Sequence, residues 1–133
     1  MRNDECEMRN NWDITERTKC FALRIIRLYS SLPKSTQAQV IGKQLLRSGT
    51  SVGAHIREGK RSRSDAEMIS KIEVAQQELE ETIYWFELLV GSNLVEADRL
   101  TGLAQEANEL LAILVSSSRT IKQRKRGSVR SEC

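Results

Sequence analysis

A chain of 133 residues, 39% of them apolar and 29% charged, has the size and composition of one globular domain. Leucine, alanine, glutamate, glutamine, arginine and lysine are abundant and proline occurs once, so the composition favours helices over strands. Apolar runs of only a few residues exclude a membrane span, and three cysteines at unrelated spacings beside one histidine support neither a disulfide framework nor a zinc site.

The net charge of +3 is unevenly distributed along the chain. Six cations stand against one carboxylate after residue 118, which gives this end a charge of +5 and leaves −2 for the rest. The first thirteen residues carry four carboxylates and no apolar stretch, so we expect no secretory signal. We therefore expect a cytoplasmic protein with reduced cysteines, an acidic body and a basic carboxyl end.

The first predicted helix covers residues 14–32. Asp13, followed three residues later by Glu16, resembles a capping pair. Pro33 should end the helix, because its ring disfavours helical geometry in the preceding residue. Apolar side chains recur at helical spacing: Phe21, Ile25, Leu28, Tyr29 and Leu32.

The second predicted helix begins after Ser35 or Thr36, either of which suits a helix start. Its apolar face consists of Ile41, Leu45, Ser48, Val52 and Ile56. Three glycines, at positions 42, 49 and 53, share one face of this helix. Either the chain breaks near residues 49–51, or these glycines let a neighbouring backbone approach closely; their common face favours the second interpretation. Gly59 is expected to close the helix.

The third predicted helix has the clearest pattern. Ser64 and Glu67 form a capping box at its start, and Gly91 supplies a stop. A heptad seam follows the box, with Ile72, Leu79 and Phe86 seven residues apart and Ile69, Gln76, Ile83 and Val90 between them.

The fourth predicted helix begins between Asn93 and Asp98 and ends near Ile121. Its apolar stripe consists of Leu100, Leu103, Ala107, Leu110, Leu111 and Leu114. Four amphipathic helices joined by short connections must lie antiparallel to their neighbours. We therefore predict an all-α protein with an up-down-up-down four-helix bundle over residues 14–121, an amino-terminal extension over residues 1–13, and a basic, disordered tail over residues 122–133.

This topology brings two basic segments to the same end of the bundle. The connection between the second and third helices should lie beside the carboxyl end of the chain. We call the resulting cluster the basic pole: Arg57, Lys60, Arg61, Arg63, Arg119, Lys122, Arg124, Lys125 and Arg126. Such a cluster suits sequence-tolerant binding of RNA or DNA phosphates. A solvated loop with a disordered tail is the alternative, and the absence of aromatics argues against stacking on single-stranded bases.

No catalytic or metal-binding pattern is present. A carboxylate-bridged metal pair in a bundle needs Glu-x-x-His on two helices, whereas this chain offers His55 and Glu58 in the reverse order. One histidine with scattered serines gives no triad, and the stretch at residues 49–53 follows no strand and does not match a phosphate-binding loop. We expect neither enzymatic activity nor a cofactor.

Charged side chains on the second and third helices are placed to form ion pairs. Glu78 and Glu81 flank the seam residue Leu79, so at least one carboxylate should be half-buried and need a partner. The expected participants are Arg47, Arg57, Glu58, Lys71, Glu78 and Glu81.

Three consecutive aromatic residues, at positions 84–86, cannot all face one core. Phe86 belongs to the seam, which leaves Tyr84 and Trp85 as candidates for a contact between subunits. The equally open alternative for Trp85 is packing at a helix boundary within one subunit.

Two stretches of the chain resemble one protein family. LLRSGTSVGAHIRE at residues 45–58 and ELEETIYWFELL at residues 78–89 look like the signature of the four-helix-bundle proteins encoded in 23S rRNA intervening sequences. The resemblance covers about residues 18–122. The chain departs from the usual pattern at His55, where the family has Asn, and at Gln77, where it often has Lys.

The resemblance implies an antiparallel four-helix bundle that forms homopentamers, in a family without a settled biochemical activity. It also implies kinship with the accessory variability proteins of diversity-generating retroelements, which bind reverse transcriptase and nucleic acid. Our first hypothesis is a non-catalytic oligomer that contacts RNA or DNA through the basic pole, where several copies would strengthen a weak contact. The second is an adaptor that docks a protein such as a reverse transcriptase, with the basic residues serving solubility.

Overall fold

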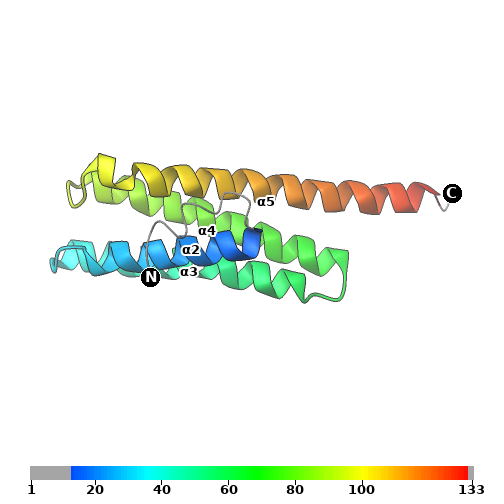
Figure 1. Ribbon diagram of the computed structural model, residues 1–133, viewed down its shortest axis with the longest axis horizontal. Coiled ribbons are helices and arrows are strands. Elements are labelled where there is room, and N and C mark those ends of the chain that lie inside the picture. Colours follow the sequence, from blue (N-terminus) through cyan, green and yellow to red (C-terminus); the bar gives the residue numbers. More distant parts are fainter. Residues whose placement is uncertain (1–12, 132–133) are drawn as a thin grey trace.

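Four long helices make up the computed structural model, which describes residues 13–131, with side chains as far as residue 124. The helices are α2 (Ile14–Ser30), α3 (Thr36–Lys60), α4 (Asp65–Gly91) and α5 (Ala97–Ser131), and no strand occurs within this range. The prediction of an all-α, four-helix protein is confirmed. Consecutive helices run in opposite directions along one long axis (Figure 1), which fits the expected up-down-up-down order. No described helix is apolar over enough length to cross a bilayer.

α2 is shorter than the helices that it packs against, so the bundle has four helices over only part of its length. Each helix packs against the next one in the chain, and α2 also contacts α5, though less extensively than the other neighbours contact one another. α2 has 17 residues, whereas α3 has 25 and α4 has 27. α2 therefore begins partway along the bundle, and beyond its first residue α3, α4 and α5 continue without a fourth helix (Figure 1).

Side-chain caps start three of the helices as the sequence predicts. Asp13 Oδ1 accepts a hydrogen bond from the Glu16 amide at 3.1 Å, and Ser35 Oγ accepts one from the amide of residue 38 at 3.3 Å. Ser64 Oγ accepts from the Glu67 amide at 3.1 Å. The Glu67 carboxylate reaches back to the amide of residue 63 rather than to that of Ser64. These bonds satisfy amide donors that have no partner within the helix.

Helix ends agree less well with the sequence patterns. α2 ends at Ser30, two residues before the predicted end, and α3 continues one residue beyond Gly59. α4 ends at Gly91 as expected, although no described glycine has a positive φ. The left-handed residue after α4 is Asn93, with φ of 62°. Asparagine tolerates this conformation better than most residues, so it takes the role that we had assigned to a glycine.

α5 extends beyond its predicted end. We placed this end near Ile121 and assigned residues 122–133 to a disordered tail, whereas the helix continues to Ser131. Ile121 is buried, and the next cations, Lys122 and Arg124, form ion pairs with carboxylates of α4 at 2.6 Å and 3.6 Å. Lysine, glutamine and arginine are also good helix formers. The basic end is therefore helical as far as the structure describes it.

The glycines of α3 allow close packing against α2, as the second interpretation of their spacing predicted. A Cβ at Gly42 would lie 2.7 Å from a Leu32 methyl carbon, and one at Gly49 would lie 2.8 Å from Ile25 Cγ1. A Cβ at Gly53 would lie 3.1 Å from a side-chain oxygen of α2. α3 is continuous through all three positions. A larger side chain would force the two helices apart.

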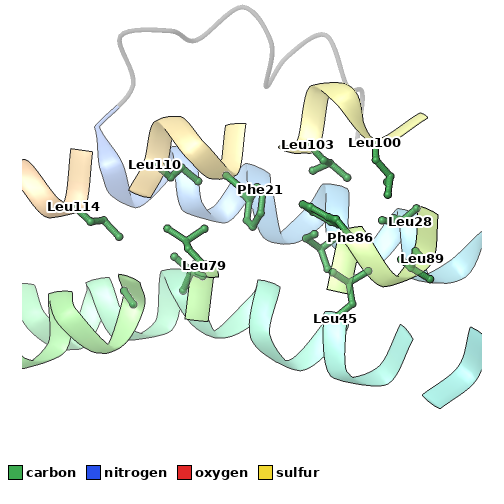
Figure 2. Close-up of a cluster of buried hydrophobic side chains, with 14 of the residues drawn as sticks. Phe21, Leu28, Leu45, Leu79, Phe86, Leu89, Leu100, Leu103, Leu110 and Leu114 are labelled. Carbon is green, nitrogen blue, oxygen red and sulfur yellow. The ribbon is translucent and has the colours of Figure 1, made fainter. Parts of the chain in front are cut away.

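The core fills the space between all four helices. Figure 2 shows apolar side chains from each helix pointing toward one another. The heptad seam of α4 is buried at Ile72, Leu79 and Phe86. Its polar interruption, Gln76, donates to the backbone oxygen of residue 114 and to Ser118 on α5, at 3.2 Å and 3.1 Å. The interruption therefore forms a hydrogen bond between helices instead of leaving a buried amide unpaired.

The state of Cys20 differs from our expectation of reduced cysteines. This residue is buried on α2 and is disulfide-bonded, so it is not the reduced thiol that we predicted. The other cysteines, Cys6 and Cys133, lie outside the described residues, as does the predicted amino-terminal extension apart from Asp13.

Candidate nucleic-acid interface

The structure brings the two basic segments together. The connection between α3 and α4 and the carboxyl end of α5 lie at the same end of the bundle (Figure 1). Arg124 Nη2 lies 3.6 Å from Asp65 Oδ1, at the first residue of α4. Lys60, at the end of α3, lines the same groove as Arg124. Segments about sixty residues apart in sequence therefore form one surface, as the topology predicted.

The cations of this surface differ in their partners. Five of them are exposed and form no ion pair within the described part of the chain: Arg57, Lys60, Arg61, Arg63 and Arg119. Lys122 pairs with Glu73, and Arg124 pairs with Asp65. The side chains of Lys125 and Arg126 lie outside the described residues. The unpaired positive charge thus lies mainly in the last turn of α3 and in the connection between α3 and α4.

An apolar groove lies beside these cations, where α2 is absent. Its volume is about 410 Å³, and Lys60 and Arg124 stand among its lining residues. The apolar part of the lining consists of Ile14, Ile56, Met68, Ile72, Leu114 and Ile121. Sequence reasoning missed this groove. The sequence feature that could have indicated it is the length of the first periodic segment, which is several residues shorter than the periodic segments of the other helices.

The predicted ion pairs between α3 and α4 are present. Arg47 Nη1 lies 2.9 Å from Glu78 Oε2, and its Nη2 pairs with Glu81. The Glu78 side chain is only 14% exposed, so this carboxylate does need its partner. It also accepts a hydrogen bond from the Ser51 hydroxyl. The core beneath contains a second polar link, because the buried hydroxyls of residues 48 and 82 lie 2.8 Å apart.

The indole of Trp85 extends this cluster. Its Nε1 donates to Glu81 Oε2 at 3.0 Å. This hydrogen bond, followed by the bond from Arg47, lowers the pKa of Glu81 below its ordinary value. The Glu81 carboxylate likewise raises the pKa of the Arg47 guanidinium. The cluster therefore holds its charged forms over an extended pH range.

A second predicted pair lies closer to the basic pole. Lys71 Nζ is 2.8 Å from Glu58 Oε2 and lowers the pKa of Glu58. His55 Nδ1 lies 3.7 Å from the other oxygen of this carboxylate. Within residues 13–131, His, Cys, Asp and Glu side chains form no group of three or more that could hold a metal ion. Arg57, the remaining expected participant, forms no ion pair with the residues that the structure describes.

The two aromatic candidates for a subunit contact have different environments. Trp85 is half-buried against the core of its own subunit, whereas Tyr84 is 51% exposed. Their ring centroids lie 5.1 Å apart, with the planes tilted by 56°. Packing within one subunit thus accounts for Trp85. Of the two candidates, Tyr84 is the one whose side chain is exposed.

An ion pair between α2 and α5 was not predicted. Arg17 Nη2 lies 2.5 Å from Glu106 Oε1 and 3.3 Å from Glu109 Oε1. Hydrogen bonding to Glu106 raises the pKa of the Arg17 guanidinium. About ninety residues separate the partners in sequence, so no local spacing could indicate them.

Comparisons with known proteins agree with this architecture. Residues 10–116 match the model of a family described as 23S rRNA-intervening sequence protein. A crystal structure from Bacteroides thetaiotaomicron, of a protein with unknown function from the S23 ribosomal protein family, is 35% identical with a TM-score of 0.76. The match covers 80% of this chain and 98% of that one. No curated protein matches. The family match ends before residue 119, so the basic carboxyl end lies outside it.

Proposed function

Because the chain belongs to the 23S rRNA-intervening sequence protein family, we propose that it is a non-catalytic, oligomeric protein that associates with RNA or DNA through the basic pole. One observation carries the proposal. Five exposed cations without ion pairs among the described residues come from the last turn of α3, the α3–α4 connection and α5, and these segments lie at one end of the bundle (Figure 1).

The arrangement suits phosphates rather than bases. Arginine and lysine that neutralise backbone phosphates release condensed counterions, and this contribution to affinity does not depend on sequence. None of the described residues that line the adjoining groove is aromatic, so they offer no ring for stacking on bases. We therefore expect similar affinity for duplexes of different sequence.

Self-association is part of the proposal. The family resemblance implies a homopentamer, and the exposed Tyr84 offers an amphipathic contact on the outer face of α4. Five copies would present five basic poles, so a weak contact at each would combine into a stronger one. Light scattering should then give a mass five times the 15.1 kDa of one chain.

Substitution of two exposed pole residues tests the binding role. Arg61→Gln/Arg63→Gln removes two unpaired cations without touching the core or an ion pair. The matched control is Lys34→Gln/Lys43→Gln, which removes two exposed lysines outside the pole. Anisotropy of a labelled RNA or DNA duplex should show at least ~10-fold weaker binding for the pole variant alone. Equal affinities for the two variants would contradict the proposal.

The alternative is an adaptor that docks a protein partner such as a reverse transcriptase. The apolar groove beside Lys60 and Arg124 favours it, because a groove of about 410 Å³ can take side chains of a partner. A pull-down with and without nuclease separates the two functions. Partners that are lost after nuclease treatment support nucleic-acid association, whereas partners that persist support the adaptor.

A further inference from the structure

Three arginines converge on a second cleft, at the end of the bundle opposite the basic pole. Arg24 and Arg27 of α2 and Arg99 of α5 line a cleft of about 290 Å³. Leu28, Ser31 and Leu103 complete its lining. Its lining residues belong to the second half of α2, the residue after it and the start of α5, and these segments lie near the connections on that side of the molecule (Figure 1).

These guanidinium groups form no ion pair within the described residues. Arg17 and Arg47 each pair with two carboxylates, whereas Arg24, Arg27 and Arg99 pair with none. Glu96 and Asp98, which flank the first turn of α5, form no ion pair with them in this part of the chain either. Three positive charges in one cleft repel one another, so an anion between them would be strongly favoured.

Two of the arginines are held in place by contacts other than ion pairs. Arg99 Nη2 donates to Ser31 Oγ at 3.0 Å, and the Ser31 hydroxyl donates to the Leu28 carbonyl at 2.8 Å. Arg24 Nη2 lies 3.1 Å from the place that a Gly102 Cβ would take, so a side chain at position 102 would make the guanidinium shift. Gly102 thus allows the Arg24 guanidinium to lie against the backbone of α5.

Arg27 differs from the other two arginines in having a buried nitrogen without a hydrogen-bond acceptor among the described residues. That nitrogen is its Nη2. A buried charged donor without an acceptor is unfavourable, and the neighbouring hydroxyl of Ser31 is already engaged with Leu28 and Arg99. Bound oxyanions offer several acceptor atoms to such a group of guanidinium donors.

We propose that this cleft binds a phosphate group. A tetrahedral phosphate presents oxygens in several directions and can accept hydrogen bonds from three guanidinium groups at once, whereas a planar carboxylate suits one or two. The cleft is larger than a phosphate alone, and Leu28 and Leu103 give it apolar walls for an attached sugar or base. The phosphate belongs either to a free nucleotide or to the end of a nucleic-acid strand.

Thermal unfolding with defined probes tests the site on the full-length protein. The probes are inorganic phosphate, adenosine monophosphate, and an oligonucleotide with either a 5′-phosphate or a 5′-hydroxyl. Each phosphorylated probe should raise the unfolding temperature of the wild type, because a ligand that binds only the folded state stabilises it. A larger shift with the monophosphate than with the oligonucleotides identifies a free nucleotide as the source. A shift that requires the 5′-phosphate on the oligonucleotide identifies a strand end.

Two variants and one control make the result specific. Arg99→Gln removes a charge at an exposed position and should weaken binding of adenosine monophosphate by about 10-fold, as expected for one charge-assisted hydrogen bond. Gly102→Ala places a Cβ 3.1 Å from Arg24 Nη2, so the guanidinium must shift slightly, and binding of adenosine monophosphate should weaken by less than in Arg99→Gln. Arg57→Gln, in the basic pole, should bind the monophosphate like the wild type. The control also keeps this proposal independent of the proposed function, because a pole that fails to bind duplexes leaves the cleft unaffected.

Three results would overturn the proposal. One is the absence of a shift with every phosphorylated probe. Another is equal binding of adenosine monophosphate by Arg99→Gln, Gly102→Ala and the wild type. The third is an equal shift with sodium chloride at matched ionic strength, since general screening would then account for the stabilisation. If a variant is too unstable to compare by melting, equilibrium dialysis of labelled adenosine monophosphate against the folded protein gives the same comparison.

Discussion

A methyl group at Gly49 should push α2 away from α3. The added Cβ would lie 2.8 Å from Ile25 Cγ1 and 2.9 Å from Ile25 Cγ2, about 1 Å inside the usual separation of ~3.5–4.0 Å between carbon atoms. Ile25 is fully buried and β-branched, so a change of rotamer gives little relief. The two helices themselves must therefore move.

Two opposing effects determine how far Gly49→Ala changes the free energy of unfolding. Overpacking of a core costs about 1–3 kcal/mol, whereas replacing a glycine inside a helix with alanine stabilises by about 1 kcal/mol. Gly49→Ala should therefore lower the free energy of unfolding by about 1 kcal/mol. Gly91→Ala is the matched control, because a Cβ at Gly91 meets nothing within 4 Å. The control should be neutral or slightly stabilising.

Urea unfolding followed by far-UV circular dichroism measures both variants. The double variant Gly49→Ala/Ile25→Ala completes a double-mutant cycle, which measures the coupling between the two positions. Ile25→Ala alone should cost about 2–5 kcal/mol, but it removes the carbon atoms that Gly49→Ala would meet, so the double variant should lose less than the sum of the single losses. A coupling of at least ~0.5 kcal/mol is expected for residues in contact. Additive losses, or a Gly49→Ala variant as stable as Gly91→Ala, would refute the close approach of α2 and α3.

Glu81→Gln should reduce the acid sensitivity of folding. Trp85 and Arg47 lower the pKa of Glu81 below 4.5 in the folded state, so its stabilising contribution is present above that value and is lost as the pH falls through the folded pKa. Urea unfolding at pH 7 and at about pH 3 should show a smaller difference for the variant than for the wild type; equal differences would contradict the assignment. Tyr84→Ser should lower the oligomer mass in light scattering at low concentration, whereas Val40→Ser, at another exposed apolar residue, should not. A Tyr84→Ser protein with unchanged mass would exclude this residue from the contact.

The fold could be predicted because its determinants are local. Helical spacing of apolar residues, the caps at Asp13, Ser35 and Ser64, and the heptad seam of α4 all act within a few turns. The helical state of residues 122–131 could not be predicted in this way. The apolar stripe that we identified ends at Leu114, and the ion pairs of Lys122 and Arg124 with α4 join residues far apart in sequence.

The candidate sites were predictable only in part. Loop connections fix which segments share an end of the bundle, so the basic pole followed from topology. The apolar groove depends on where α2 begins relative to its neighbours, which is a matter of register between helices. The arginine cleft joins residues of α2 and α5, and its members have no common spacing or motif. Such a site emerges only once the helices are packed.

The salt dependence of duplex binding tests the basic pole most directly. Each phosphate contact contributes about −0.9 to the slope of log affinity against log salt on duplex DNA, so contacts from all five exposed, unpaired cations of the described pole would give a slope of about −4.5. Arg61→Gln/Arg63→Gln should reduce the magnitude of this slope by about 2, and Lys34→Gln/Lys43→Gln should leave it unchanged. Equal slopes for the pole variant and the wild type would contradict binding through the basic pole.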